Sequence, residues 1–481
     1  MDIVRWLPWG VEAFARAREE DRPVLLSISA VWCEACQEMY RTSFADPLVA
    51  AVINDHFVPV RVDADRRPDI SERYTLGAWP TTAFLTADGD VIGGGTFIER
   101  ARMPSILERV AEAFTKRRAE LTAAGAVATP RAPRASPPRI DLAAQIFETF
   151  DRVHGGFGHE PKFPLTSPID LALARHRGDG DEMMAQIVEA TLDAMGWGGL
   201  YDEVDGGFYR CALRRDWQEP RYEKLLDVNA NLLRTYVDAL ATLRAARYGE
   251  RAADIVRYVQ TWLADPVDGG WSSSQAADRD YYTAAFDARR ARAAPPVDHV
   301  LYVSANARMI SAALRAAEVL DDTALGEFAL KSLERLAVAC YRPGEGIAHC
   351  LEVTPSIRGL LDDQVAMAGA LLDAHEATGN IVYEMMAQEL AHFAIRVMWD
   401  DEGGGFFDRA VVEPGELVGR MRERVKPFAA NCEAARVLKR LATAKGDHDF
   451  GARAAATLEA VELSAWQQGP LAADYLLALR S

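Results

Sequence analysis

The sequence predicts two domains of different class, an N-terminal α/β domain and a C-terminal all-α domain built as an (α/α)6 barrel. Apolar runs typical of strands alternate with helix-like segments at the start, and a proline-rich stretch follows. The remainder shows helical spacing of apolar residues, interrupted by a recurring Gly-Gly-aromatic motif. A chain of 481 residues with 49 % hydrophobic residues can fill two cores. We therefore predict an α/β domain at 1–120, a linker at 121–139 and a barrel at 140–481.

The first domain is predicted to be a βαβαββα unit. An amphipathic stretch from Val11 to Glu20 precedes the apolar strand Val24–Ser29, and Cys33 and Cys36 open the next helix. The remaining elements are a strand at Val58–Val62, a helical segment at Ile70–Leu76, a hairpin at Thr82–Thr96 that turns at Asp88-Gly89, and a helix at Met103–Lys116.

The linker and the barrel follow from composition and repetition. Pro130, Pro133, Pro137 and Pro138 lie in one basic stretch that has few apolar residues, which predicts a linker. Twelve helical segments then make six hairpins. Glycine-rich corners recur between them, at Gly155-Gly156-Phe157, Gly206-Gly207-Phe208, Gly269-Gly270-Trp271, Gly404-Gly405-Phe406 and, in degenerate form, Gly344-Glu345-Gly346. Corners that repeat in this way predict that the hairpins close into a barrel.

The Cys-x-x-Cys motif carries an explicit mechanism. At a helix start, unsatisfied backbone N–H groups and the helix dipole stabilise a thiolate, so Cys33 is predicted to be the exposed nucleophile and Cys36 the resolving thiol. Half of a zinc site is the alternative, but this domain holds no second Cys-x-x-Cys and no His-x-x-x-His to complete one. We therefore expect a redox pair, with no metal and no cofactor.

These residues resemble thioredoxins. The shared features are Pro23-Val24-Leu25-Leu26 at the strand, Trp32-Cys33-Glu34-Ala35-Cys36, and Trp79-Pro80-Thr81 before the hairpin. The resemblance implies that Trp32 and Pro80 belong to the catalytic site and that the bond before Pro80 is cis. Two departures, Ser27 in place of a buried acid and Glu34-Ala35 in place of Gly-Pro, lead us to expect a slow and rather reducing pair.

The whole chain resembles the YyaL and spermatogenesis-associated protein 20 family, which fuses a thioredoxin-like domain to a six-hairpin, glycosidase-like barrel. The matching motifs are Trp9-Gly10-x-Glu12-Ala13-Phe14, Arg67-Pro68-Asp69-Ile70, Gly155-Gly156-Phe157-Gly158-His159-Glu160-Pro161-Lys162-Phe163-Pro164, Gly199-Leu200-Tyr201-Asp202 and Tyr222-Glu223-Lys224-Leu225-Leu226. The family usually has Cys-His-Trp-Cys-His, a longer start, and Asp-Ala-Asp where this chain has Ala276-Ala277-Asp278. The chain is thus expected to be a shortened, divergent member.

Barrels of this kind resemble six-hairpin glycosidases and N-acylglucosamine 2-epimerases, which implies a sugar site lined by acids and aromatics. The candidate binding residues are Glu160, Lys162, Asp202, Trp217, Tyr222, Glu223, Asp227, Asn229 and Asp278. Any single one of these polar residues has a structural alternative, since Asp, Asn and Glu near helix starts often cap them and Glu223-Lys224 can pair with neighbouring helices. The cluster between Tyr201 and Asn229, which adjoins two glycine corners, favours a pocket.

The net charge and the hydropathy of the sequence indicate which classes of binding partner and which cellular location to expect. A formal net charge of −17 argues against binding to nucleic acid or to an anionic membrane. No apolar run approaches the length of a membrane span, and the start lacks a basic region followed by an apolar core, so a cytoplasmic location is expected. Three functions stay open: a thiol-disulfide oxidoreductase acting on protein disulfide clients, a barrel that binds or converts a small polar or sugar ligand, and a non-catalytic scaffold.

Overall fold

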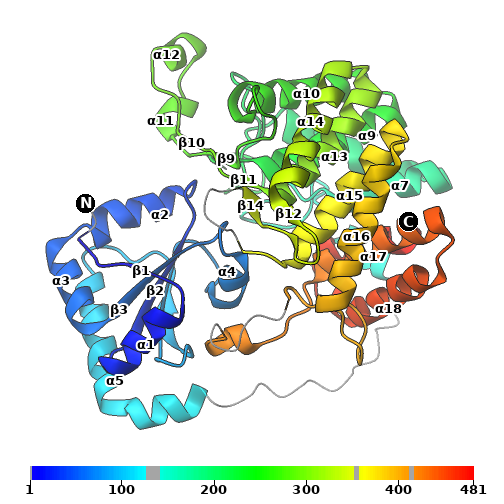
Figure 1. The fold of residues 1–481 in the computed structure, drawn as a ribbon. Helices are drawn as coiled ribbons and strands as arrows, with labels where there is room; N and C mark the ends of the chain where they lie inside the picture. The colour runs from blue at the N-terminus through cyan, green and yellow to red at the C-terminus, as the bar shows by residue number, and fades with distance from the viewer. Residues whose placement is uncertain (1–2, 126–140, 352–356, 411–416) are drawn as a thin grey trace. The chain divides into compact units, whose positions relative to one another are not determined.

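The computed structural model describes residues 3–125, 141–351, 357–410 and 417–481, without the side chains of 117–125. The chain forms two units (Figure 1). Unit 1 comprises 1–134 and 411–424, and unit 2 comprises 135–410 and 425–481. Residues 126–139 of the predicted linker lie outside the described residues. The predicted fold class, α/β followed by an (α/α)6 barrel, is confirmed by the elements below.

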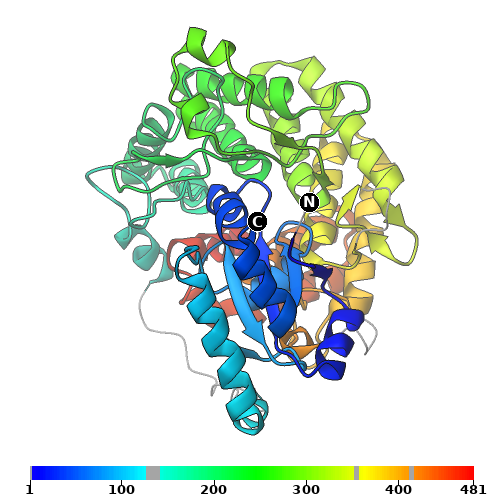
Figure 2. The same cartoon turned by 90° about the vertical axis from the view of Figure 1, so that its left-hand side faces the viewer.

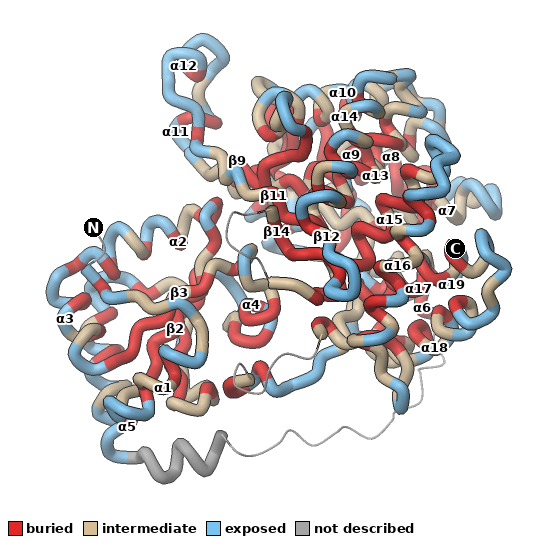
Figure 3. The backbone as a smooth tube through the Cα atoms, in the orientation of Figure 1, coloured by how far each residue is buried: buried red, intermediate tan, exposed pale blue. Residues whose placement is uncertain are grey.

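Unit 1 is built on one mixed five-stranded sheet. The strands are β1 (Leu7–Pro8), β2 (Val24–Ser29), β3 (Val58–Asp63), β4 (Thr81–Leu85) and β5 (Val91–Gly95), in the order β1-β3-β2-β4-β5. The pairs β1–β3 and β2–β3 are parallel, and β4 and β5 are antiparallel to their neighbours. Strands β2 and β4 are buried along nearly their whole length because both faces of the sheet are covered (Figure 3).

The helices of unit 1 largely follow the prediction. They are α1 (Val11–Glu19), α2 (Glu34–Met39), α3 (Pro47–His56), α4 (Pro68–Tyr74) and α5 (Met103–Gly125). Helix α3 and the short strand β1 were not predicted. The sequence does carry a start signal for α3, because Asp46 caps the backbone N–H groups of Leu48 and Val49 and Pro47 occupies the first turn.

A segment from the second half of the chain completes unit 1. The part of unit 2 that precedes this segment ends at Ala410. Residues 417–424 then pack against α4, and they include the 3-10 turn η4 (Gly419–Arg422). The Arg73 side chain donates hydrogen bonds to the carbonyls of Arg420 (3.1 Å) and Glu423 (2.8 Å). The sequence placed this segment in the barrel, because its neighbours on both sides belong there.

The described residues of unit 2 form twelve barrel helices. Six are inner helices: α7 (Ser167–Asp179), α9 (Leu226–Leu243), α13 (Val303–Leu320), α15 (Leu361–Thr378), α17 (Phe428–Lys445) and α19 (Ala473–Arg480). Six are outer helices: α6 (Leu142–Glu148), α8 (Glu182–Gly196), α10 (Ala246–Tyr258), α14 (Thr323–Cys340), α16 (Ile381–Met398) and α18 (His448–Ala465). Five inner helices, α7, α9, α13, α15 and α17, form hairpins with the outer helix that follows them in the chain, as predicted, and the sixth pair, α19 and α6, joins the two ends of the barrel.

The inner helices close a ring. Helix α9 packs on α13, α13 on α15, α15 on α17 and α17 on α19, and α19 returns to α7 and so to α9. In Figure 2 the colour passes around the ring from teal through green and yellow to red, so the two ends of the unit meet. Leu142, Ile146, Leu171 and Tyr475 belong to the small apolar cluster that seals this junction. Within the described residues, no helix combines the length and the apolar character of a membrane span.

The glycine corners are a repeated device that leads from an outer helix to the next inner helix. At each complete corner, an aspartate N–H donates to the carbonyl of the second glycine, and the aspartate carboxylate accepts N–H groups of the turn; these aspartates are Asp151, Asp202, Asp265 and Asp400. At the last three complete corners and at the degenerate one, an amide side chain near the start of the next inner helix bonds both backbone groups of the residue after the glycines. These amides are Asn229, Asn306, Asn431 and, at the degenerate corner, Gln364.

The glycines of the complete corners are required because each has a positive φ and lies against protein. A Cβ on Gly155 would meet the Ala190 carbonyl of α8 at 2.3 Å, and one on Gly207 would meet the Tyr258 ring at 2.5 Å.

Short strands support the corners. They are β6 (Cys211–Ala212), β7 (Pro220–Arg221), β8 (Lys224–Leu225), β9 (Ser274–Gln275), β10 (Val297–Asp298), β11 (Leu301–Tyr302), β12 (Tyr341–Arg342), β13 (Gly346–Ile347) and β14 (Cys350–Leu351). Between β9 and β10 the chain makes an excursion, residues 276–296, that carries α11 (Arg279–Tyr282) and α12 (Phe286–Arg290).

Candidate functional site

The cysteine motif lies where the sequence placed it, between β2 and α2. Cys33 is the N-cap residue of α2, and its Sγ accepts a hydrogen bond from the Cys36 N–H at 3.3 Å. Both thiols are buried, with exposed fractions of 5 % and 4 %, so the expectation that Cys33 is exposed is wrong. A sulfur that receives a backbone N–H at a helix start is stabilised as the thiolate, which is the attacking form in disulfide exchange. Among the described residues, no three His, Cys, Asp or Glu side chains are grouped to hold a metal ion.

Two tryptophans flank the motif. The Trp32 indole N–H donates to Asp65 at 2.6 Å, and the Trp32 and Trp79 rings meet edge to face with centroids 5.6 Å apart. The Trp79–Pro80 bond is cis, as the resemblance to thioredoxins implied. Trp79, which contacts Trp32, is 36 % exposed, and Val31, two residues before Cys33, is 45 % exposed, so the unit presents apolar surface near the motif.

The buried position Ser27 has a basic neighbour. Ser27 on β2 is directly opposite Arg61 on β3, and the Arg61 guanidinium lies over the rings of Trp6 and Tyr40 at 4.6 and 4.5 Å. A serine side chain cannot relay a proton as a buried carboxylate can. The slow pair expected from the sequence stays a prediction.

Four barrel candidates are structural parts of the corners. Asp202 and Asn229 belong to the corner before α9, as described above. Lys162 is fully buried, pairs with Asp151 at 2.8 Å and lies 4.8 Å from the centre of the Trp217 ring. The Trp217 indole N–H donates to the His154 carbonyl at 3.0 Å. These contacts satisfy the polar groups within the protein and fix the rim of the barrel.

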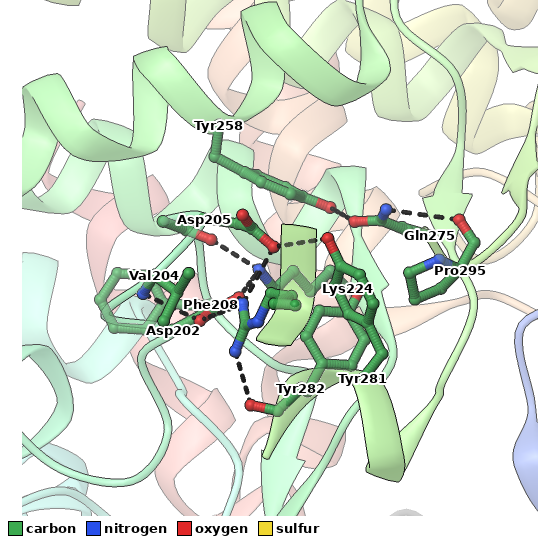
Figure 4. Close-up of polar contacts among 12 residues, drawn as sticks. Asp202, Val204, Asp205, Phe208, Lys224, Tyr258, Gln275, Tyr281, Tyr282 and Pro295 are labelled. Carbon is green, nitrogen blue, oxygen red and sulfur yellow. Dashed lines mark hydrogen bonds and ion pairs between the residues drawn. The ribbon is translucent and has the colours of Figure 1, made fainter. Parts of the chain in front are cut away.

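The corner before α9 contains a buried cluster of charges (Figure 4). The Lys224 ammonium lies 2.7 Å from Asp202 and donates to the Gly206 carbonyl. The Arg289 guanidinium bonds both Asp202 (2.8 Å) and Asp205 (2.9 Å). Burial lowers the pKa of Lys224 to about 8 although Asp202 opposes this shift. Burial also opposes ionisation of Asp202, but the two cations hold the pKa of its carboxyl below the usual value.

Aromatic rings enclose this cluster. The Lys224 ammonium lies 4.4 Å from the Tyr258 ring centre and 5.0 Å from that of Tyr282. The predicted residue Tyr222 stacks on Tyr282 at 6.0 Å with the rings 4° from parallel. Cation–π contacts of this kind stabilise a desolvated ammonium.

Glu223 is buried beside this corner. One carboxylate oxygen, Oε1, accepts two hydrogen bonds from Arg210 at 2.9 and 3.0 Å. The other, Oε2, is buried without a hydrogen-bond partner among the described residues. A buried carboxylate oxygen without a donor is costly, so it is a candidate for binding a ligand hydroxyl.

The remaining predicted residues, Glu160, Asp278 and Asp227, do not lie together in one site. Glu160 is exposed and accepts the Arg215 N–H at 2.8 Å. Asp278 caps α11 by accepting the Tyr281 N–H at 2.9 Å. Asp227 lies in the first turn of α9 and is exposed, and its surroundings include Arg308 and Asp362 of the neighbouring inner helices. The structure thus joins Asp202, Tyr222 and Lys224 at one corner and places Asp227 in a different cluster.

That second cluster, here called the axial cluster, consists of Asp227, Arg308, Asp362 and Glu433. Arg308 forms a bidentate pair with Asp362 at 2.5 and 3.1 Å and reaches Glu433 at 3.0 Å. The surrounding helices desolvate Asp227 and raise the pKa of its carboxyl although water reaches the side chain. Arg308 lowers the pKa of Asp362 against the opposing effect of burial. The inner helices therefore present ionised and polar groups to water inside their ring.

Two further carboxyls of the inner helices are able to hold a proton near neutral pH. Burial raises the pKa of Asp170 to about 7, although a hydrogen bond of 2.8 Å from Thr235 opposes the shift. Burial likewise raises the pKa of Asp474 to about 6. A carboxyl with such a pKa can donate or accept a proton, which is the property required of a general acid or base.

Arg308, Asp362 and Glu433 were not predicted as site residues, but the sequence carries a signal for them. The corner amides Asn306, Asn431 and Gln364 point outward to the corners. Two residues along a helix turn the side chain by about 200°. Asp227 and Asp362 come two residues before a corner amide, and Arg308 and Glu433 come two residues after one. These positions therefore face away from the corner.

The comparisons with known proteins agree with this architecture. The family model Thioredox_DsbH, described as a protein of unknown function, DUF255, matches residues 1–130. The human spermatogenesis-associated protein 20 is 25 % identical over 84 % of this chain and 69 % of that protein. The uncharacterized protein B0495.5 of Caenorhabditis elegans is 29 % identical over 57 % of this chain, and the match spans only 41 % of that protein's length. The resemblance predicted from the motifs is thereby confirmed.

Two comparisons concern single domains. The thiol:disulfide interchange protein DsbD of Ralstonia nicotianae is 37 % identical over 16 % of this chain and 14 % of that protein. The solved cellobiose 2-epimerase of Bacillus thermoamylovorans covers 66 % of this chain and 83 % of its own with a TM-score of 0.54 and 12 % identity, which shows the fold alone. The chain thus combines a thioredoxin-like domain similar to DsbH and DsbD with a barrel of the epimerase fold.

Proposed function

We propose that the protein is a thiol-disulfide oxidoreductase in which Cys33 is the nucleophile. The observation that carries this proposal is the hydrogen bond from the Cys36 N–H to the Cys33 sulfur at the start of α2. The Cys33 thiolate attacks one sulfur of a client disulfide and releases the other as a thiolate. Cys36 then attacks the Cys33 sulfur, so the client leaves with two thiols and the pair becomes a disulfide. The scattered spacing of the other four cysteines suits a reducing cytoplasm.

We expect Cys33 to be alkylated faster than Cys36 in the reduced protein, because the helix start stabilises its thiolate. Iodoacetamide labelling followed by peptide mass mapping measures the two rates. Cys33→Ser should abolish reduction of insulin by the full chain with dithiothreitol as the electron source, and Cys36→Ser should trap a mixed disulfide. Cys211→Ser, which changes a buried barrel thiol, is the matched control and should retain full activity. Faster labelling of Cys36 would contradict the assignment.

A second candidate function is binding of a sugar or polyol by the barrel. The axial cluster supports it, because Asp227 is reachable by water and forms no ion pair with any described residue. Carboxylates accept hydrogen bonds from hydroxyl groups, and the Arg308 guanidinium donates them. The epimerase fold adds support only by analogy.

A panel of mono- and disaccharides is expected to include at least one that raises the unfolding temperature of the full chain, since a ligand that binds only the folded state stabilises it. At about 100 times Kd the shift should be on the order of 2–4 °C. Asp227→Ala should remove the shift, and Asp278→Ala, which changes only the cap of α11, should retain it. A flat response to the whole panel would favour the scaffold.

A further inference from the structure

The excursion between β9 and β10 is an exposed segment with one buried anchor. Most of its residues from Thr283 to Ala294 are exposed (Figure 3), yet Arg289 within it is 3 % exposed. Arg289 bonds Asp202, Asp205 and the Tyr282 carbonyl, and the Tyr281 hydroxyl also donates to Asp205 at 3.1 Å. The excursion is therefore held at a defined place against the barrel instead of extending freely into solvent.

A cavity of about 420 Å³ lies between this segment and the end of helix α10. Its volume falls within the range of small-molecule sites. Four arginines line it, Arg257, Arg289, Arg290 and Arg292, against a single acid, Asp205. Because Asp205 already binds Arg289 and Tyr281, the cavity has an excess of positive charge in a chain whose net charge is −17.

Two of these guanidinium groups lack a carboxylate. Arg257 pairs with Asp254 at 3.0 Å, and Arg289 pairs with Asp202 and Asp205. Arg290 and Arg292 form no ion pair with any residue that the structure describes; Arg290 lies over the Phe286 ring at 4.6 Å. Trp262 and Phe286 add aromatic surface to the lining. The cavity therefore offers charge for an anion and flat apolar surface for a ring.

We propose that this cavity binds a small organic phosphate that carries a ring. Arginine presents several N–H donors in a planar fork that matches the geometry of phosphate oxygens. Aromatic side chains cover the face of a ring and leave its polar substituents directed at the guanidinium groups. This site is separate from the cysteine motif and from the axial cluster, so it stands whether or not those perform the functions proposed above.

Isothermal titration of the full chain at low ionic strength tests the proposal with four probes: phenyl phosphate, inorganic phosphate, benzoate and phenol. Phenyl phosphate should bind most tightly, inorganic phosphate more weakly, and phenol not measurably. The double variant Arg290→Ala/Arg292→Ala should weaken phenyl phosphate by about tenfold or more, because it removes two charge-assisted donors. Both side chains are exposed, so the variant should fold normally.

Arg152→Ala/Arg279→Ala is the matched control. It also removes two exposed arginines, one of them on the same excursion, but neither lines the cavity. It should change the Kd for phenyl phosphate by less than about twofold, since only general electrostatics is altered. Equal weakening by the two double variants, benzoate binding as tightly as phenyl phosphate, or the absence of any binding by the wild type would each overturn the proposal.

Discussion

Asp202→Asn is expected to lower the free energy of unfolding of the barrel by about 3–5 kcal/mol, the usual cost of leaving a buried charge without its partner. The substitution keeps an oxygen that can cap the turn at Val204 but removes the negative charge. Lys224 and Arg289 are then left buried beside a neutral group. Urea unfolding followed by far-UV circular dichroism, which is dominated by the helical barrel, measures the loss.

The corner before α13 supplies the control. Asp265 occupies the same position as Asp202 and caps its turn in the same way, but its partner Arg335 is 25 % exposed and Asp265 itself is 35 % exposed. Asp265→Asn is therefore expected to cost only about 1 kcal/mol, as for a solvated ion pair. Equal losses in the two variants would show that the cap, and not the buried charge, determines the stability of the corner.

The pH dependence of this effect has a defined sign. The pKa of Lys224 is lowered to about 8 in the folded protein and is about 10.5 in the unfolded chain. Between these values the unfolded chain binds more protons, so the contribution of Lys224 to stability rises with pH. Loss of the Asp202 charge lowers the folded pKa further. The deficit of Asp202→Asn should therefore narrow as the pH is raised towards 8 and stay constant above it, because Lys224 is then neutral in both folded proteins.

The sequence predicted the parts of the fold that depend on local repetition. The glycine pairs identify the corners because only glycine accepts the positive φ and close contacts found there, as Gly155 and Gly207 show. The cysteine motif and the cis bond before Pro80 followed from matched residues. In contrast, Asp202 and Asn229 were predicted to bind a ligand; the structure shows their hydrogen bonds within the corner, and ligand binding stays a prediction. A polar residue at a barrel rim has the same signature in both roles until its partners are known.

Long-range partners account for what the sequence did not indicate. Arg289 lies 87 residues from Asp202 in an excursion without regular periodicity, and nothing local marks it as buried. Arg73 and Arg420 are 347 residues apart and yet share hydrogen bonds. Such pairs carry no signal in a single sequence, because each arginine alone is typical of an exposed helix or turn.

The second large effect on stability is expected from a substitution in residues 417–424, which complete unit 1. Tyr74 of α4 is buried; its hydroxyl donates to the Gly89 carbonyl at 2.9 Å and accepts the Arg420 N–H at 2.9 Å. Gly419 has a φ of 51°, and a Cβ there would lie 2.1 Å from the Gly89 carbonyl oxygen and 2.5 Å from the Tyr74 hydroxyl. Any side chain at this position must displace backbone, so the contact depends on glycine.

Gly419→Ala is expected to destabilise unit 1 by about 2–4 kcal/mol, from the left-handed backbone conformation and from the loss of hydrogen bonds at Tyr74. Gly77→Ala is the matched control in the same unit, because Gly77 also has a positive φ but a Cβ there meets nothing within 4 Å; it should cost about 1–2 kcal/mol. Hydrogen exchange of the β2 and β4 amides reports the stability of unit 1. We expect faster exchange in Gly419→Ala than in Gly77→Ala. Residues 417–424 complete the thioredoxin-like unit, so the unit must lose stability when a Cβ at position 419 collides with Gly89 and Tyr74. Equal exchange in the two variants would mean that unit 1 is stable without this segment.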